Sequence, residues 1–276
     1  MPKRTSISLV IPVYNEEAYL GDCLRAALAQ SLPFDEIIVV DNNSTDGAVA
    51  IAAQFPGVRL IREPRQGVVY ARDRGFDAAR GDVIARIDAD TRLAPDWAQQ
   101  LLATFADPSV GAATGLVHYS DMRLARFIDW VDRFWRRRIT RLLRPEMPLQ
   151  GANMAVRARA WRKVRAHACR KRGLHEDFDL AIHLAACGER VVYDEALAAT
   201  LGLRCCQAKF ASYCRYWLFC PRTYAYHGLK SRRHMYPIIT LLIMAYPVLK
   251  LLHKAPVGQL LPLAAAVRVN PAAYVD

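Results

Sequence analysis

Short apolar runs alternate with segments of helical spacing through the first half of the chain. Each run is followed by a polar turn and then by a helical period. Strands separated by helices of this length are usually parallel neighbours, so the alternation predicts an open α/β sheet, mostly parallel and covered by helices on both faces. The expected strands are 7–14, 36–40, 58–62, 82–87 and 110–117, and the expected helices are 17–30, 46–55, 67–80 and 95–106.

Polar clusters follow three of these strands, at 14–16, 41–43 and 88–90. In open α/β sheets, ligands bind in the crevice outside the carboxyl ends of the strands. We therefore expect the three clusters to converge on one binding crevice.

The third cluster contains two carboxylates, Asp88 and Asp90. Residues two apart on an extended segment point the same way, so these carboxylates should project together and repel each other. A divalent cation would neutralise them, and Mg²⁺ usually takes one or two protein carboxylates plus substrate phosphates. The alternative is that both cap the helix that begins near Pro95. No glycine-rich phosphate loop follows any of these strands, so a metal ion and arginine would have to hold a phosphate group.

One region accounts for the net charge of +12. Residues 123–172 contain sixteen Lys and Arg against three Asp and Glu, which gives +13 and leaves −1 for the rest. Within it, 122–144 reads as a basic amphipathic helix with two Trp, the composition expected of a helix lying in a membrane interface. An ordinary domain helix with its apolar face in the core is the alternative. The apolar stripe is Leu124, Ile128, Val131, Trp135, Ile139 and Leu142.

The second half continues with a short strand into a helix at 150–161, a helix at 174–188 that stops at Gly188, and a closing strand RVVYDEAL. Two uncharged apolar runs follow, 235–249 and 255–267. Both are shorter than the roughly 18–20 residues that span a bilayer, and prolines interrupt them. We expect them to be re-entrant or surface-lying membrane segments, or helices that pack on the catalytic domain.

The expected domains are a catalytic domain, 1–205, and an aromatic and apolar C-terminal segment, 206–276. The chain has seven cysteines, an odd number with no CxxC pair, which favours reduced thiols in a cytosolic setting over a disulfide framework. The first apolar run ends at Asn15 and Glu16, so it predicts a strand and not a signal peptide.

An ordered set of short motifs resembles family-2 glycosyltransferases with the glycosyltransferase A fold. The motifs are SLVIPVYNEEAYL (8–20), IIVVDNNSTDG (37–47), GVVYARDRGFDAARGD (67–82), IARIDADT (84–91), QGANMAV (150–156) and HEDFDLAIHLAACG (175–188). The resemblance covers residues 7 to about 200. It implies transfer of a sugar from a nucleotide-diphosphate donor, most commonly a UDP-sugar, with inversion at the anomeric carbon.

The resemblance also implies roles for the donor-side residues. Asp41 would accept hydrogen bonds from the nucleotide base, helped by Pro12, Tyr14 and Glu16. Arg72 would face the donor, since a guanidinium suits phosphate oxygens. On the sequence alone, Asp41 could equally be a turn-forming residue, and Arg72 a solvated helix arginine.

The catalytic residues are implied in the same way. Asp88 would reach the ribose or the metal hydration shell, and Asp90 would ligate Mg²⁺ or Mn²⁺. Asp177 would take the proton of the acceptor hydroxyl, and Glu176 would orient the acceptor or raise the pKa of Asp177 through its like charge. Alternatively, the acidic pair only favours the positive end of a helix.

His118, at the end of a strand, is interpreted as structural. His175 and His183 are interpreted as ordinary polar residues, with contact to the donor diphosphate as the alternative. The chain also departs from the family's processive members, which carry QxxRW after the acidic pair. The nearest text is SYCRYW (212–217), without the Gln and with Arg215 and Trp217 one residue further apart. Single-sugar transfer is therefore expected.

These observations lead to a metal-dependent inverting glycosyltransferase that is peripheral on the cytoplasmic face of the plasma membrane, with a lipid-linked or saccharide acceptor. A non-catalytic basic module on an anionic membrane surface is the alternative. A nucleic-acid partner is not expected, because the aromatic residues of the basic region have helical spacing and apolar neighbours. Nucleotidyl transfer would require a glycine-rich basic loop near the amino terminus, and IPVYNEEAYL is not one.

Overall fold

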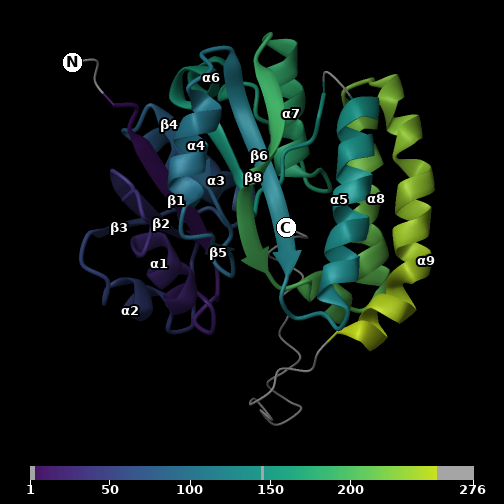
Figure 1. Ribbon diagram of the computed structural model, residues 1–276, viewed down its shortest axis with the longest axis horizontal. Helices are drawn as coiled ribbons and strands as arrows, with labels where there is room; N and C mark the ends of the chain where they lie inside the picture. Colours follow the sequence, from purple (N-terminus) through teal and green to yellow (C-terminus); the bar gives the residue numbers. More distant parts are fainter. Residues whose placement is uncertain (1–3, 144–145, 254–276) are drawn as a thin grey trace.

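The computed structural model describes residues 4–143 and 146–253, and a sheet of eight strands forms its centre (Figure 1). The strand order is β3-β2-β1-β4-β7-β6-β8-β5. The strands are β1 (Ile7–Val13), β2 (Glu36–Asp41), β3 (Val58–Arg62), β4 (Val83–Arg86), β5 (Arg92–Leu93), β6 (Val110–Tyr119), β7 (Met154–Arg157) and β8 (Arg190–Leu201).

The helices follow the strands in the alternation that the sequence predicts. They are α1 (Leu20–Leu28), α2 (Ala48–Ala52), α3 (Val68–Ala78), α4 (Trp97–Phe105), α5 (Ala125–Leu142), α6 (Ala158–Val164), α7 (Glu176–Ala186), α8 (Phe210–Tyr226) and α9 (Tyr236–Leu252). Two short 3₁₀ turns, η1 (Arg204–Gln207) and η2 (Lys230–His234), flank α8.

The sheet is parallel from β3 to β4, and β7 runs against both of its neighbours. Side chains of β1 alternate between two cores: Leu9 and Ile11 pack with α1 and α4, whereas Val10 packs with α3, α6 and α7. Helices therefore cover both faces, as expected. The expected strands and helices of the first half are all present, with ends shifted by a few residues.

At one end of the sheet, α5, α8 and α9 lie side by side (Figure 1). The expected helix at 122–144 is α5, but its faces differ from the expectation. Ile128 and Ile139 pack inward, whereas Leu124 and Leu142 are exposed. A second row of apolar side chains lies outside that stripe and is also exposed: Phe127, Trp130 and Phe134.

The expectation that prolines interrupt the run 235–249 is wrong. Pro237 lies in the first turn of α9, where its missing N–H costs nothing, and Pro247 lies inside a continuous helix. Ile239 and Tyr246 pack α9 into two separate apolar clusters, which stabilises the helix despite the hydrogen bond lost at Pro247. With the preceding turn, Lys230–Leu252 has 23 residues and is long and apolar enough to cross a membrane by length and composition alone. The run 255–267 lies outside the described residues.

Asn153, from the QGANMAV motif, connects four elements through its buried amide. Its Nδ2 donates to the Leu116 and Leu197 carbonyls at 2.9 and 2.7 Å, and its Oδ1 accepts from Trp97 Nε1 at 3.0 Å. The β6–β8 pairing shifts register between Gly115 and Leu116, so this side chain satisfies carbonyls that the irregular ladder leaves open.

We predict that Asn153→Ala lowers the free energy of unfolding by about 3 kcal/mol, because it leaves the Trp97 N–H and two carbonyls without partners. Urea denaturation followed by Trp fluorescence measures this. Gln99→Ala, on the exposed side of α4, is the control and should change stability by less than about 0.5 kcal/mol. Equal stability of the two variants would contradict the role given to Asn153.

Candidate active site

A cleft lies at the carboxyl ends of β1, β2 and β4, which confirms that the three polar clusters converge. The loop before α3 and the turn η1 complete its walls. Its lining residues are Pro12, Val13, Tyr14, Glu16, Asn42, Gln66, Gly67, Val68, Ala71, Arg86, Asp88, Ala89 and Arg204.

The wall after β2 is organised by Asn42, which the sequence analysis did not single out. Its amide donates to the carbonyls of Glu63 and Arg65 at 2.9 and 2.7 Å and accepts from Gly67 N at 2.8 Å. Gly67 begins α3 at φ +134°, a conformation that other residues rarely adopt. Asn42 thereby holds the start of α3 against the end of β2.

Asp41 is buried, and its Oδ1 accepts from Ser44 N at 2.9 Å. This is the turn-forming arrangement considered as the alternative for this residue. Asp41 is not among the cleft-lining residues described above, so a contact with a nucleotide base stays a prediction.

Behind the cleft lies a buried ion cluster that joins three elements. Arg72 on α3 and Arg86 on β4 both donate to the Glu176 carboxylate at the start of α7, and Arg72 Nη1 also donates to the Glu176 carbonyl at 2.6 Å. Arg72 Nη2 pairs with Asp73 at 2.8 Å, and Arg86 Nη2 pairs with Asp88 at 3.0 Å. Burial alone would raise the pKa of Glu176, but Arg86 and Arg72 outweigh it and lower that pKa.

The placement of Arg72 differs from the expectation of a donor-facing group. Its side chain is fully buried, and its guanidinium contacts Glu176 and Asp73. Arg86 lines the cleft instead. A direct contact between Arg72 and a donor stays a prediction.

Asp177 lies next to this cluster and is held by two backbone donors. Its Oδ2 accepts from Gly151 N at 3.0 Å and its Oδ1 from Phe178 N at 2.9 Å. Burial, and then the neighbouring charge of Glu176, raise its pKa. A Cβ at Gly151 would lie 2.4 Å from Arg86 Nη1, so a larger residue would displace the guanidinium that pairs with Glu176. The site thus contains an oriented carboxylate with increased proton affinity.

On the other side of the cleft, Arg204 joins two carboxylates. Its two Nη atoms donate to Glu16 at 2.8 and 2.7 Å, and its Nε lies 2.9 Å from Asp90 Oδ2. Burial raises the pKa of Asp90 to about 7, an effect that Arg204 opposes and that Asp88 and Glu16 increase.

These charges fit a divalent cation. Glu16 and Asp88 line the cleft, and Asp90 does not line it but pairs with Arg204, which does. Carboxylate oxygens are the ligands that Mg²⁺ and Mn²⁺ prefer. Burial raises the pKa of Asp90 most, and the negative charges of Asp88 and Glu16 add to it, so a cation at this position would stabilise the ionised carboxylate. Asp90, with Asp88 beside it, could therefore hold such an ion.

His118, His175 and His183 do not line the cleft. His175 Nε2 lies 3.0 Å from the Tyr216 carbonyl, and its ring stacks on Phe178. His118 Nδ1 lies 2.9 Å from Asp129 Oδ2. His183 lies beside Asp179, on the part of α7 that follows the acidic pair.

The sequence analysis missed Arg86 and Arg204. Arg86 had a visible signal, since it is a charged residue in an apolar strand and lies two residues before Asp88, on the same side. Arg204 had none, because it is 188 residues from Glu16 in the sequence.

Residues 8–165, more than half of the chain, match the sequence profile of glycosyl transferase family 2. The putative glycosyltransferase EpsH of Bacillus subtilis (strain 168) is 36% identical over 106 residues, which are 37% of this chain and 31% of EpsH. Hyaluronan synthase of Streptococcus pyogenes is 32% identical over 125 residues, 41% of this chain and 30% of the synthase. The chain therefore spans about a third of the length of these relatives.

Solved structures support the fold. The mannosyltransferase PcManGT of Pyrobaculum calidifontis, in complex with GDP-Man and Mn²⁺, matches with a TM-score of 0.68 at 21% identity. The match covers 99% of this chain and 78% of the PcManGT chain. TarS 1–349 of S. aureus, in complex with UDP-GlcNAc, matches with a TM-score of 0.60 at 15% identity. This match covers 78% of this chain and 65% of the TarS chain. The chain belongs to glycosyl transferase family 2 and has the glycosyltransferase A fold that the order of its motifs implies.

Proposed function

We propose that this protein transfers one sugar from a nucleotide-diphosphate sugar to an acceptor hydroxyl, with inversion and with a divalent metal. The observation that carries the proposal is the arrangement of Asp177: a carboxylate with a raised pKa, oriented by Gly151 N and adjacent to the cleft residue Arg86. A base with increased proton affinity accepts a hydroxyl proton more readily at neutral pH.

In this reaction the acceptor oxygen attacks the anomeric carbon while its proton passes to Asp177. The bond from that carbon to the donor diphosphate breaks on the opposite face, and the nucleoside diphosphate leaves with the bonding electron pair. A metal ion at Asp90 would stabilise the negative charge on the leaving group. Arg86, in the cleft wall, would face the same charge. A UDP-sugar is the donor we expect.

We predict that Asp177→Asn lowers the transfer rate about 10²- to 10⁴-fold, because the amide cannot accept the proton, while donor binding and the unfolding midpoint change little. Single-turnover transfer and donor titration measure the two effects. Asp22→Asn, an exposed carboxylate on α1, is the control. Transfer by Asp177→Asn at the rate of the unchanged protein would eliminate Asp177 as the base.

A second prediction concerns metal binding and pH. Because the pKa of Asp90 is about 7, this carboxylate is protonated below that pH and a metal ion has to displace the proton. The affinity for Mn²⁺ should fall about tenfold per pH unit below 7 and level off above it. Calorimetric titration between pH 5.5 and 8.5 measures this, with Asp90→Asn as the comparison. Affinity that is independent of pH, or undiminished in Asp90→Asn, would count against the assignment.

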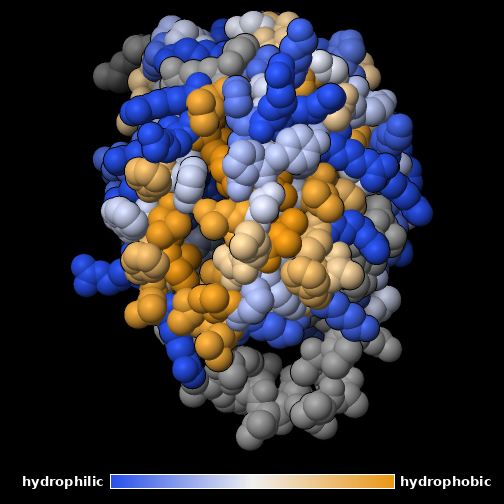
Figure 2. All heavy atoms as spheres, turned by 90° about the vertical axis from the view of Figure 1, so that its right-hand side faces the viewer, coloured by the Kyte–Doolittle hydropathy of each residue, from blue (hydrophilic) through white to orange (hydrophobic). Residues whose placement is uncertain are grey.

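We propose further that the face formed by α5, α8 and α9 rests on an anionic membrane. Figure 2 shows apolar side chains gathered on this face, with hydrophilic residues beside them. Trp130 on α5 is 62% exposed, and Met244 and Leu251 on α9 are 72% and 77% exposed. Burial of such side chains in lipid stabilises each by about 1.5–3 kcal/mol. Lys230, Arg232 and Arg233 in η2, directly before α9, add positive charge.

This face suggests a lipid-linked acceptor, since a membrane-bound enzyme meets such acceptors in the plane of the bilayer. All seven cysteines are free. Free thiols are typical of proteins in the reducing cytosol, which supports a location on the cytoplasmic side of the plasma membrane.

The membrane proposal predicts that the protein sediments with vesicles containing phosphatidylglycerol. The double variant Trp130→Ser/Met244→Ser should bind more than tenfold more weakly, because it loses two side chains that enter the lipid, each with about 1.5–3 kcal/mol. The control is Leu28→Ser, an exposed leucine on α1. Equal sedimentation of the two variants would refute the assigned face.

A further inference from the structure

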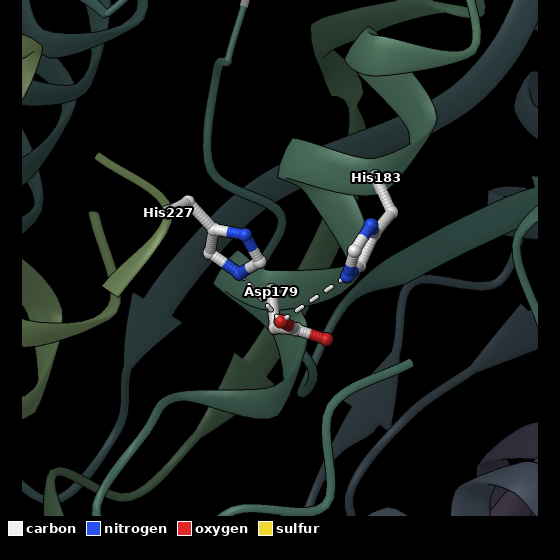
Figure 3. Close-up of side chains that lie close together, drawn as sticks. All are labelled: Asp179, His183 and His227. Atoms are coloured by element: carbon white, nitrogen blue, oxygen red, sulfur yellow. Dashed lines mark hydrogen bonds and ion pairs between the residues drawn. The ribbon is translucent and has the colours of Figure 1, made fainter. Parts of the chain in front are cut away.

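A cluster of two histidines and one aspartate lies where α7 contacts α8. It contains Asp179 and His183, one helical turn apart on α7, and His227 at the end of α8 (Figure 3). None of the three side chains lines the cleft. The residues of the proposed transfer reaction do not include any of the three.

The three side chains point their ligand atoms at one position. His227 Nε2 lies 2.8 Å and His183 Nε2 3.5 Å from the same oxygen of Asp179, Oδ1. The two rings are nearly perpendicular, with centroids 5.0 Å apart. Asp179 is fully buried, and His183 Nε2 is a buried nitrogen without a hydrogen-bond partner. Two imidazoles converging on one buried carboxylate oxygen leave a polar atom unsatisfied, which is a poor arrangement for a purely structural hydrogen bond.

The spacing suits a tetrahedral metal ion. With bonds of about 2.0–2.1 Å, neighbouring ligand atoms around Zn²⁺ lie about 3.4 Å apart, and the two nitrogens lie 2.8 and 3.5 Å from the carboxylate oxygen. Small rotations of the rings would bring both distances to that value. Two imidazole nitrogens also favour Zn²⁺ over the Mg²⁺ or Mn²⁺ expected at Asp90.

The surroundings of Asp179 complete the arrangement. Its second oxygen, Oδ2, accepts from Cys169 N at 2.8 Å, which orients the carboxylate.

We propose that Asp179, His183 and His227 bind one Zn²⁺ ion, with the fourth position open to water. The ion would fasten the end of α8 to the middle of α7. One turn before His227, Thr223 Oγ1 already accepts from His175 N at 2.9 Å, directly before the acidic pair. Zinc would therefore stabilise the helix that presents Glu176 and Asp177, without taking part in the transfer reaction.

The test uses the full chain, stripped with EDTA and titrated with ZnCl₂ alone, with bound metal counted by mass spectrometry after dialysis. The unchanged protein should retain one zinc per chain and gain thermal stability on binding it. His183→Gln and His227→Gln should each bind zinc more than about 100-fold more weakly. Losing a residue that only hydrogen-bonds to a metal ligand already lowers metal affinity about 10- to 100-fold, and losing a ligand itself should lower it further. His118→Gln is the control, because it also breaks a His–Asp pair, 2.9 Å long, and should keep the zinc.

Further measurements separate this site from folding defects and from the donor metal. His183→Gln and His227→Gln should unfold at the same midpoint as the unchanged protein without zinc, which would show that both variants are folded. Asp90→Asn should lose Mn²⁺ binding and retain zinc. The proposal is overturned if the unchanged protein retains no zinc, or if His183→Gln and His227→Gln retain it as His118→Gln does.

Discussion

Two buried guanidiniums around one carboxylate hold the centre of this molecule together. The side chains of Arg72 and Arg86 are 0% and 3% exposed, and both donate to Glu176. Removing two cations from water costs several kcal/mol each unless their partners are close and well oriented. Asp73 and Asp88 supply the remaining negative charge. Because α3, β4 and α7 each contribute a member, the cluster determines where α7 begins and therefore where Asp177 lies.

The two sides of the cleft have complementary electrostatics. On the α7 side, arginines keep Glu176 ionised while Asp177, directly after it, has a raised pKa. On the opposite side, carboxylates exceed their cationic partners, and Asp90 has a raised pKa with Arg204 as its counter-ion. One side thus suits proton acceptance, and the other suits a metal ion and the diphosphate that it would bind. Arg204, which pairs with Glu16 and Asp90, would have to release part of this contact when a cation binds.

The sequence predicted the layout of the sheet well, because the strand and helix periods of the first half depend on local patterns of apolar residues. It also predicted that polar residues at the ends of β1, β2 and β4 would meet. It could not predict which side chains would be buried as ion pairs. Arg72 looked like a solvated or donor-facing arginine, and only the packing of α3 against α7 places it next to Glu176. Arg204 depends on a contact between distant parts of the chain, and the two faces of α5 depend on where α8 and α9 pack.

The most direct test of this account is the release of nucleoside diphosphate from a panel of nucleotide sugars, measured with Mn²⁺ or Mg²⁺ and with or without a membrane lipid extract. The account predicts release from one donor that requires the metal, rises when lipid is added and is absent in Asp177→Asn. If no nucleotide sugar is turned over with any metal or lipid, and none raises the thermal stability of the protein, the transferase assignment is contradicted and a non-catalytic module on a membrane surface takes its place.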